Sequence, residues 1–236
     1  MSTINVTLPD LPYAVEEALN RLRVNIKFCG KNTKKILIAS SVANEGKTFV
    51  AIHLWHMLAE AGFPTVLVDT DLRKSVLKSR FQFQSDDEIK GLDYYLSGWA
   101  EYSDVVYKTN IKNGDIVPCT NLLENPSSLL EDARFGELFD KLTEDYRYVI
   151  IDSAPLVNVA DGALIASMCD GAVLVVRSAE TSRNLVKQSV TQLQRSGCKL
   201  LGMVLNMTSV TSRAYYKYYG KYGKEYYGGK HTNGNK

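Results

Sequence analysis

A strand, a short loop and a helix follow one another between Lys35 and Gly62, and this unit constrains the fold more than any other stretch of the chain. The apolar run Ile36–Ala39 is typical of a strand that is covered on both faces of a sheet. The segment after Thr48 carries enough apolar residues for a largely buried helix, which Gly62 can end. Units of this kind build parallel sheets.

The loop of this unit fits the phosphate-binding P-loop, Gly-x-x-x-x-Gly-Lys-Ser/Thr, at all but one position, because Ser41 stands where the first glycine is usual. Backbone N–H groups at the start of a helix point outward without partners, and the helix dipole adds positive charge, so phosphate oxygens bind there. Gly46 lets the backbone pass close to the phosphates. Lys47 can reach the β- and γ-phosphates, and the Thr48 hydroxyl can ligate Mg²⁺. The predicted ATP-binding residues of the loop are Ser41, Val42, Ala43, Asn44, Glu45, Gly46, Lys47 and Thr48.

Gly-Lys-Thr taken alone is also compatible with an exposed turn that enters an ordinary helix. The strand before the loop and the helix after it supply the context that the motif requires, and they favour the phosphate site.

Two later strands are predicted to end in carboxylates. Asp69 and Asp71 follow the buried strand Thr65–Val68, and the strand that starts at Tyr146 ends in Asp152. The carboxyl ends of parallel strands face the ligand crevice, so these side chains are expected beside the P-loop. Paired carboxylates suit Mg²⁺ binding and proton acceptance, and a carboxylate at a strand end suits a Walker B position. A capped turn is the alternative for Asp69 and Asp71, and Asp152 alone is a weak signal because strands often end in aspartate. The conjunction of three strand ends favours a nucleotide site.

Strands and helices alternate over the rest of the chain, which predicts an α/β fold with a doubly wound, mostly parallel sheet of P-loop NTPase type and helices on both faces. Residues 1–11 are expected to form an irregular arm, a strand is expected near Val105–Tyr107, and a helix is expected to run from a turn at Asn125–Ser128 to about Leu142. Asn206, just past the last predicted strand, is a candidate contact to the nucleotide base, with a turn asparagine as the equal alternative.

Length and composition set the remaining bounds. The 236 residues suffice for one substantial α/β domain and an appendage, and a net charge of +2 predicts no strongly charged partner. The four cysteines lack metal-ligand or redox spacing, which indicates reduced thiols in a cytosolic protein. The first residues lack a signal-peptide pattern, and no apolar run approaches the roughly 20 residues that span a bilayer, so we expect an intracellular protein.

Tyrosines crowd the end of the chain, where seven of the 14 lie within the last 22 residues. They alternate with glycine and lysine and have no periodicity that could bury them, so a disordered C-terminal tail is expected. Such a segment could also stack on nucleic-acid bases or lie at a membrane interface. Next to an ATP site, however, the cluster is better interpreted as a set of phosphoacceptors, each of which would gain about −1.5 to −2 charges. The predicted acceptors are Tyr215, Tyr216, Tyr218, Tyr219, Tyr222, Tyr226 and Tyr227.

Four features together resemble the bacterial P-loop tyrosine kinases (BY-kinases) of the cytoplasmic capsule- and exopolysaccharide-biosynthesis type, over nearly the whole chain. These are Ser41–Thr48 as Walker A, Val66–Arg73 as a second Asp-x-Asp motif, Val149–Pro155 as Walker B, and the tail tyrosines. The resemblance implies an ATP-binding kinase domain over residues 1–212, a flexible acceptor tail over 213–236, and ATP with Mg²⁺ as cofactors.

The same resemblance implies autophosphorylation in trans within a ring-shaped homo-oligomer, and control of polysaccharide synthesis and export. It also implies stimulation by the cytoplasmic end of a membrane polysaccharide co-polymerase, which recruits the kinase to the inner face of the cell membrane. It further implies that a dedicated tyrosine phosphatase reverses the reaction. We expect no nucleic-acid partner, because proteins that stack on bases usually hold their aromatic side chains on a folded platform.

Residue roles follow from the resemblance. Lys47 stabilises the charge of the transferring phosphoryl group, and Asp69 is the base near the tyrosine hydroxyl. Mg²⁺ is held, directly or through water, by Thr48, Asp71 and Asp152.

The N-terminal helix of the family carries Glu-x-x-Arg-x-x-Arg at subunit contacts. Glu17 and Arg23 match this motif, whereas Asn20 occupies the middle position with Arg21 beside it. On spacing alone, Glu17, Arg21 and Arg23 indicate a solvated charged face. The mismatch bears on the oligomer contact and not on the chemistry.

Two other interpretations stay open. A partition or septum-positioning ATPase shares the fold and the Asp-x-Asp region, but such proteins usually carry a second lysine immediately after the first P-loop position, where this chain has Val42. They also have no use for a tail rich in tyrosine. A non-catalytic adaptor, in which ATP drives assembly and the tail docks partners, is the alternative from another class.

Overall fold

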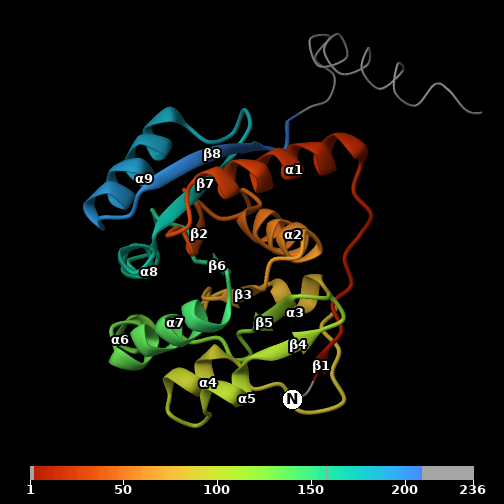
Figure 1. Cartoon of the computed structure of the whole chain (residues 1–236). Helices are drawn as coiled ribbons and strands as arrows, with labels where there is room; N and C mark the ends of the chain where they lie inside the picture. The colour runs from red at the N-terminus through yellow and green to blue at the C-terminus, as the bar shows by residue number, and fades with distance from the viewer. Residues whose placement is uncertain (1–2, 158, 209–236) are drawn as a thin grey trace, which may run out of the picture. The chain divides into compact units, whose positions relative to one another are not determined.

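An eight-stranded sheet runs through the part of the chain that the computed structural model describes, residues 3–157 and 159–208 (Figure 1). The strand order is β1-β4-β5-β3-β6-β2-β7-β8, and every neighbouring pair is parallel except β4 with β5. The strands are β1 (Thr3–Ile4), β2 (Lys35–Ser40), β3 (Thr65–Asp69), β4 (Tyr107–Thr109), β5 (Gly114–Val117), β6 (Tyr148–Asp152), β7 (Gly171–Arg177) and β8 (Leu200–Asn206). The predicted doubly wound, mostly parallel sheet is confirmed.

Helices cover both faces of the sheet. They are α1 (Tyr13–Phe28), α2 (Lys47–Glu60), α3 (Leu77–Arg80), α4 (Leu92–Leu96), α5 (Tyr102–Val105), α6 (Ser127–Leu130), α7 (Ala133–Asp145), α8 (Asp161–Ser167) and α9 (Arg183–Arg195). Side chains from α1–α3 pack in one hydrophobic cluster, and side chains from α4–α9 pack in the other. The molecule is therefore a three-layer α/β/α sandwich around a central sheet.

The central strands supply both clusters because successive side chains of a strand point to opposite faces. In β2, Ile36 and Ile38 pack with α1–α3, whereas Leu37 and Ala39 pack with the helices of the other face. Residues on both faces are thus buried, which explains the continuous apolar run that predicted this strand. Gly46 precedes α2 with φ 92°, a left-handed conformation that a glycine adopts without strain.

Three local expectations differ from the structure. The helix expected to reach Leu142 is two helices, because Asp132 adopts an extended backbone and its side chain caps α7 by accepting from the Arg134 N–H. The strand expected near 105–107 begins only at Tyr107, since Val105 ends α5. The N-terminal arm contains the two-residue strand β1, which pairs with β4.

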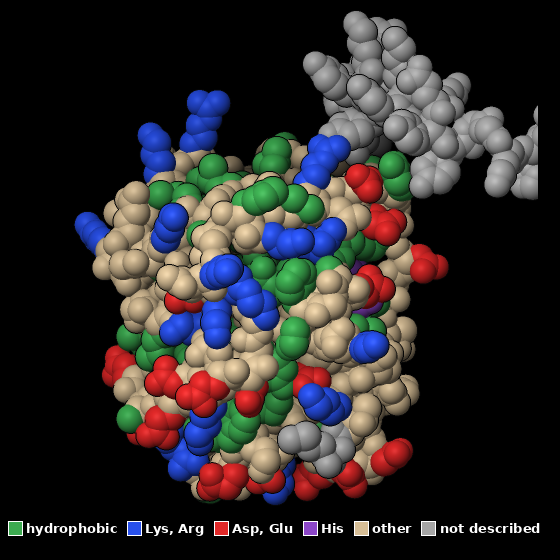
Figure 2. Space-filling view, in the orientation of Figure 1, with side chains coloured by type: hydrophobic (Ala, Val, Ile, Leu, Met, Phe, Trp, Pro, Cys, Tyr) green, Lys and Arg blue, Asp and Glu red, His purple; other side chains and the backbone are tan. Residues whose placement is uncertain are grey.

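The surface mixes both signs of charge. Figure 2 shows lysine, arginine and carboxylate side chains interspersed with hydrophobic ones on the face seen in Figure 1, in keeping with the net charge of +2. Across residues 3–157 and 159–208, no helix combines the length and the apolar character that crossing a bilayer requires. The predicted tail, residues 213–236 with its seven tyrosines, lies outside the described residues.

Candidate functional site

Three adjacent strands deliver the predicted site residues to one edge of the sheet. In the order β3-β6-β2, the strand that leads into the P-loop pairs with β6, and β6 pairs with β3, so both strands that end in aspartate lie on the same side of β2. All three are parallel, and Asp69 lies opposite Asp152 in the register of β3 and β6. The carboxyl ends therefore coincide, as the sequence predicts.

Lys47 lies between the carboxylates at this edge. Its Nζ is 3.1 Å from Asp71 Oδ2 and 3.7 Å from Asp152 Oδ1, and all three side chains are largely buried. The Thr48 hydroxyl bonds to Asp152 and lies 3.4 Å from Lys47 Nζ. The predicted convergence of Lys47, Asp71 and Asp152 is confirmed.

Burial and like charge shape the ionisation of this cluster. Burial alone would lower the pKa of Lys47, but the carboxylates of Asp152 and Asp71 outweigh it and raise the pKa above its ordinary value. Burial, followed by the charge of Asp152, raises the pKa of Asp69. Burial also raises the pKa of Asp152, although Lys47 opposes this. Three carboxylates thus face one ammonium group, an excess of negative charge that a bound cation would relieve.

The donor set fits Mg²⁺. Asp152 Oδ1 is buried and has no hydrogen-bond partner among the described residues, so an acceptor oxygen is left for a cation. Thr48 and Asp71 add oxygens beside it. Within the described part of the chain, no group of three or more His, Cys, Asp or Glu side chains is arranged to hold a metal alone. Mg²⁺ usually takes one or two carboxylates together with water and substrate phosphates.

Asp69 is buried close to the carboxylates of Asp71 and Asp152. It is 1% exposed, and its oxygens accept from the Asp71 N–H at 3.2 Å and from the Ser75 hydroxyl. Its assignment as the base stays a prediction, while its contacts show that it orients Asp71. Sequence reasoning missed Ser75, which lies beyond the Asp-x-Asp motif.

The unusual first position of the P-loop has a partner. Ser41 is fully buried, and the Ser189 hydroxyl of α9 donates to Ser41 Oγ at 2.9 Å. A serine replaces the usual glycine because a second buried serine satisfies its hydroxyl. No signal in the sequence connects these two residues.

Glu45 ties the P-loop to two other segments. Its buried carboxylate accepts from the Val42 N–H at 2.9 Å, from the Arg177 N–H at 3.4 Å and from the Thr181 hydroxyl. The Asn206 amide donates to the Glu45 carbonyl at 2.9 Å. The structure therefore brings Asn206 to the P-loop, while its contact to a nucleotide base stays a prediction.

The outer turn of the P-loop is formed by Ala43 and Asn44, which are exposed. Asn44 has φ 65°, a conformation that asparagine tolerates better than most residues.

The segment after β3 is anchored by Arg73, whose Nε lies 2.5 Å from the buried Asp161 of α8. Ser127 also donates to Asp161, at 2.8 Å, and the sequence did not single out either of these partners.

The candidate oligomer residues lie on α1, which packs against α2. Arg21 is exposed, whereas Glu17 and Arg23 are half-buried. Arg23 Nε donates to the Asn20 side chain at 3.4 Å, so the residue that breaks the family motif is engaged within the helix. A role at subunit contacts stays a prediction.

The chain is similar to a known domain family and to known proteins over most of its length. The AAA domain family matches residues 33–197. The chain is 41% identical to "Tyrosine-protein kinase CpsD" of Streptococcus agalactiae over 209 residues, which covers 89% of this chain and 90% of that protein. It is 34% identical to the protein of the same name from Streptococcus pneumoniae, over 95% of this chain and 100% of that protein.

Solved structures show the same relationship. The chimerical protein CapA2B2 superposes with a TM-score of 0.76 at 30% identity, covering 86% of this chain and 92% of that chain. The septum site-determining protein MinD of Pyrococcus horikoshii, in complex with Mg-ADP, superposes with a TM-score of 0.63 at 23% identity, covering 76% of this chain and 72% of that chain. The likeness to MinD is one of fold alone.

Proposed function

This chain belongs to the AAA domain family and, within it, to the bacterial tyrosine-protein kinases of the CpsD and CapB type, and from this premise we propose that it transfers the γ-phosphoryl group of ATP to tyrosines of its own C-terminal tail. The observation that carries the proposal is the convergence of Lys47, Thr48, Asp71 and Asp152 at one sheet edge. The partition or septum-positioning ATPase is less well supported, since relatives that cover most of the chain are named tyrosine-protein kinases.

The P-loop residues 41–48 hold the phosphates of ATP. N–H groups at the start of α2 face them, and Lys47 exchanges its carboxylate partners for phosphate oxygens when the nucleotide binds. Thr48, Asp71 and Asp152 hold Mg²⁺, which supplies charge neutralisation on the phosphates. Asp69, held by Ser75 and raised in pKa by burial, is proposed to accept the proton of the tyrosine hydroxyl.

Regulation follows the family. The kinase domain (1–212) phosphorylates the tail (213–236) in trans, within a homo-oligomeric ring that Glu17, Arg21 and Arg23 help to form. A membrane polysaccharide co-polymerase recruits this cytoplasmic protein to the inner face of the membrane and activates it, and a cognate tyrosine phosphatase reverses the modification. The reaction controls capsular or exopolysaccharide synthesis and export.

The experiment is a mass-spectrometric map of phosphates on the full chain after incubation with ATP and Mg²⁺, with and without the activating membrane segment and with a chelator as the blank. We expect phosphate on the tail tyrosines, and none with the chelator. Release of free phosphate without labelled tyrosine would identify an ATPase. Nucleotide binding without either product would identify an adaptor.

Transfer in trans is tested by mixing two variants. One carries Lys47→Met and an intact tail, and the other has a wild-type site with all seven tail tyrosines changed to Phe. We expect the tail of the Lys47→Met chain to be labelled only in the mixture. Labelling of neither chain in the mixture, while the wild type labels itself, would show transfer within one chain.

A further inference from the structure

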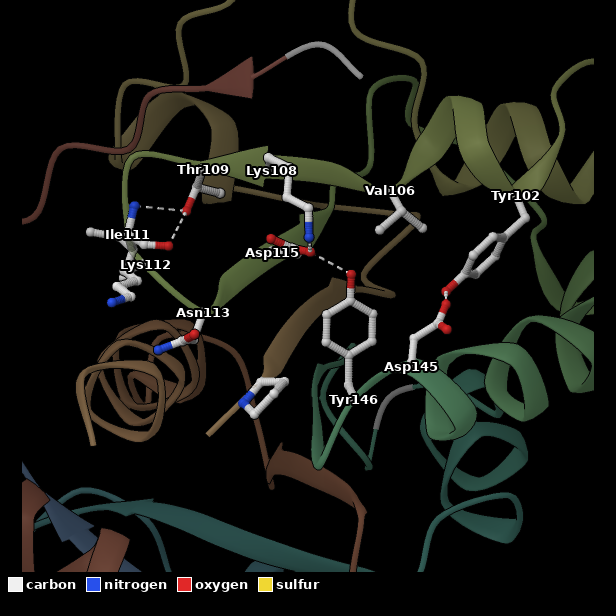
Figure 3. Close-up of a pocket in the computed structure, with 11 residues that line it drawn as sticks. Tyr102, Val106, Lys108, Thr109, Ile111, Lys112, Asn113, Asp115, Asp145 and Tyr146 are labelled. Atoms are coloured by element: carbon white, nitrogen blue, oxygen red, sulfur yellow. Dashed lines mark hydrogen bonds and ion pairs between the residues drawn. The ribbon is translucent and has the colours of Figure 1, made fainter. Parts of the chain in front are cut away.

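A polar cavity lies at the opposite edge of the sheet from the P-loop, and Figure 3 shows the residues that line it. Pro64 precedes β3, Asn113 precedes β5 and Tyr146 lies just before β6, so the cavity opens at the amino ends of these strands. Its volume is ≈ 540 Å³. Small-molecule sites have volumes of roughly 300–1,000 Å³, so this cavity is large enough for one.

A buried carboxylate forms the floor of the cavity. Asp115 is 4% exposed, and its Oδ2 accepts from Lys108 Nζ at 2.5 Å and from the Tyr146 hydroxyl at 2.5 Å. Its Oδ1 has no hydrogen bond to the described residues and is not among their buried unsatisfied atoms. The two donors therefore fix the carboxylate, and one oxygen stays accessible from the cavity as an acceptor (Figure 3).

The polar groups of the wall are balanced in charge. Lys108 and Lys112 contribute two positive charges, and Asp115 and Asp145 contribute two negative charges. Lys112 is exposed and has no hydrogen-bond or ion-pair partner within the described residues, so its ammonium is available as a donor on the rim. A cavity without net charge does not select a phosphate or another polyanion, in contrast to the P-loop edge.

Apolar surface lies between these groups. Pro64, Val106 and Ile111 line the cavity, and Figure 3 shows the ring of Tyr146 next to Asp115 and the ring of Tyr102 next to Asp145. The Tyr146 hydroxyl stays protonated, because burial and the bond to Asp115 raise its pKa. The wall of the cavity therefore offers a ligand hydrogen-bond donors, an acceptor oxygen and flat apolar surface.

We propose that this cavity is a binding site for a neutral saccharide. A sugar carries hydroxyls that both donate and accept, which matches an ammonium donor beside a carboxylate acceptor, and its C–H faces match aromatic and aliphatic surface. In the bound state, Asp115 Oδ1 accepts from one sugar hydroxyl and Lys112 donates to another. This site is separate from the kinase site, and its existence does not rest on the proposed activity.

The test is a titration of the ¹⁵N-labelled full chain with glucose, galactose and N-acetylglucosamine, followed by NMR. Inorganic phosphate and glucose 6-phosphate serve as charged comparators. We expect at least one neutral sugar to shift amide resonances around Asn113–Asp115 with saturation. Absence of saturable shifts with every neutral sugar, or shifts with the phosphates alone, would overturn the proposal.

Two variants locate the site. Lys112→Ala should weaken sugar binding about two- to tenfold, the contribution of one hydrogen bond, and Asp115→Asn should weaken it more. Lys187→Ala, an exposed lysine on α9, is the matched control and should bind as the wild type does. If Asp115→Asn fails to fold, the Lys112→Ala result decides alone. If Lys112→Ala binds the sugar with wild-type affinity, the assignment of the saccharide site to this cavity is wrong.

Discussion

Lys47 and Lys108 both pair with an aspartate, but they do so at opposite edges of one sheet and in different surroundings. The side chain of Lys47 is 11% exposed and faces Asp71 and Asp152, with Asp69 nearby. The side chain of Lys108 is 58% exposed and faces only Asp115. A lysine–aspartate pair is therefore part of a buried cluster with excess negative charge at one edge. At the other edge, such a pair is part of a partly hydrated site whose charges balance.

The difference shows how one architecture presents two kinds of polar site. At the carboxyl edge, a buried carboxylate oxygen without a hydrogen bond and an excess of carboxylates suit a cation and its phosphates. At the amino edge, Lys108 and Tyr146 satisfy one oxygen of Asp115, so no strong charge is left to recruit an ion. Burial and charge balance, more than residue type, separate the two edges.

The largest expected effect is on kinase activity, which should depend on Lys47 and not on Lys108. Lys47→Met should lower the rate of tail phosphorylation by at least about a hundredfold, because it removes the positive group that meets the transferring phosphate. The measurement is incorporation of labelled phosphate, with circular dichroism to show that the fold is kept. Lys108→Met should keep the rate within about twofold of wild type. An equal loss of phosphorylation rate in both variants would contradict the functional difference between the two edges.

A second prediction asks whether the carboxyl edge is built before the nucleotide arrives. Glu45→Gln keeps the shape of the side chain but replaces one acceptor oxygen by an NH₂ group that cannot accept the present donors. Affinity for ATP, measured by calorimetry, should fall roughly tenfold. Glu60→Gln, an exposed position at the end of α2, is the matched control. Unchanged affinity in Glu45→Gln would mean that the nucleotide itself organises the loop.

The smallest effect concerns stability at the amino edge. Tyr146→Phe removes a hydrogen bond to a buried carboxylate and should lower the free energy of unfolding by about 1.5–3 kcal/mol. Lys108→Met breaks a pair whose lysine is mostly hydrated and should cost less than about 1 kcal/mol. Urea denaturation measures both. A larger loss for Lys108→Met would show that the ion pair, and not the tyrosine, holds Asp115.

Much of the carboxyl edge was predictable. Gly46, Lys47 and Thr48 are consecutive, and their chemistry follows from a strand before them and a helix after them. Asp71 and Asp152 are far apart in sequence, but Asp71 closely follows one apolar strand and Asp152 ends another. Parallel pairing of these two strands brings their carboxyl ends together. The split between α6 and α7 was missed because the Asp132 cap is a single-residue signal inside an otherwise helical stretch.

The partners of the site residues were not predictable. Ser41 meets Ser189 across a separation of 148 residues, and Glu45 meets Thr181 across 136. Neither contact follows from a motif, since serine, threonine and glutamate are ordinary residues on a loop or a helix. The amino-edge cavity was equally unpredictable, because Asp115 and Tyr146 become neighbours only when β5 and the start of β6 are in place.

The sequence by itself determined the fold class, the phosphate loop and the acidic strand ends, because periodic burial and local backbone geometry depend on residues that are close along the chain. Only the tertiary structure decided which carboxylate oxygen lacks a hydrogen bond, which hydroxyl supports Ser41 and where the amino-edge cavity opens. Those features depend on distances of a few ångströms between segments that the packing of both helix layers on the sheet brings together.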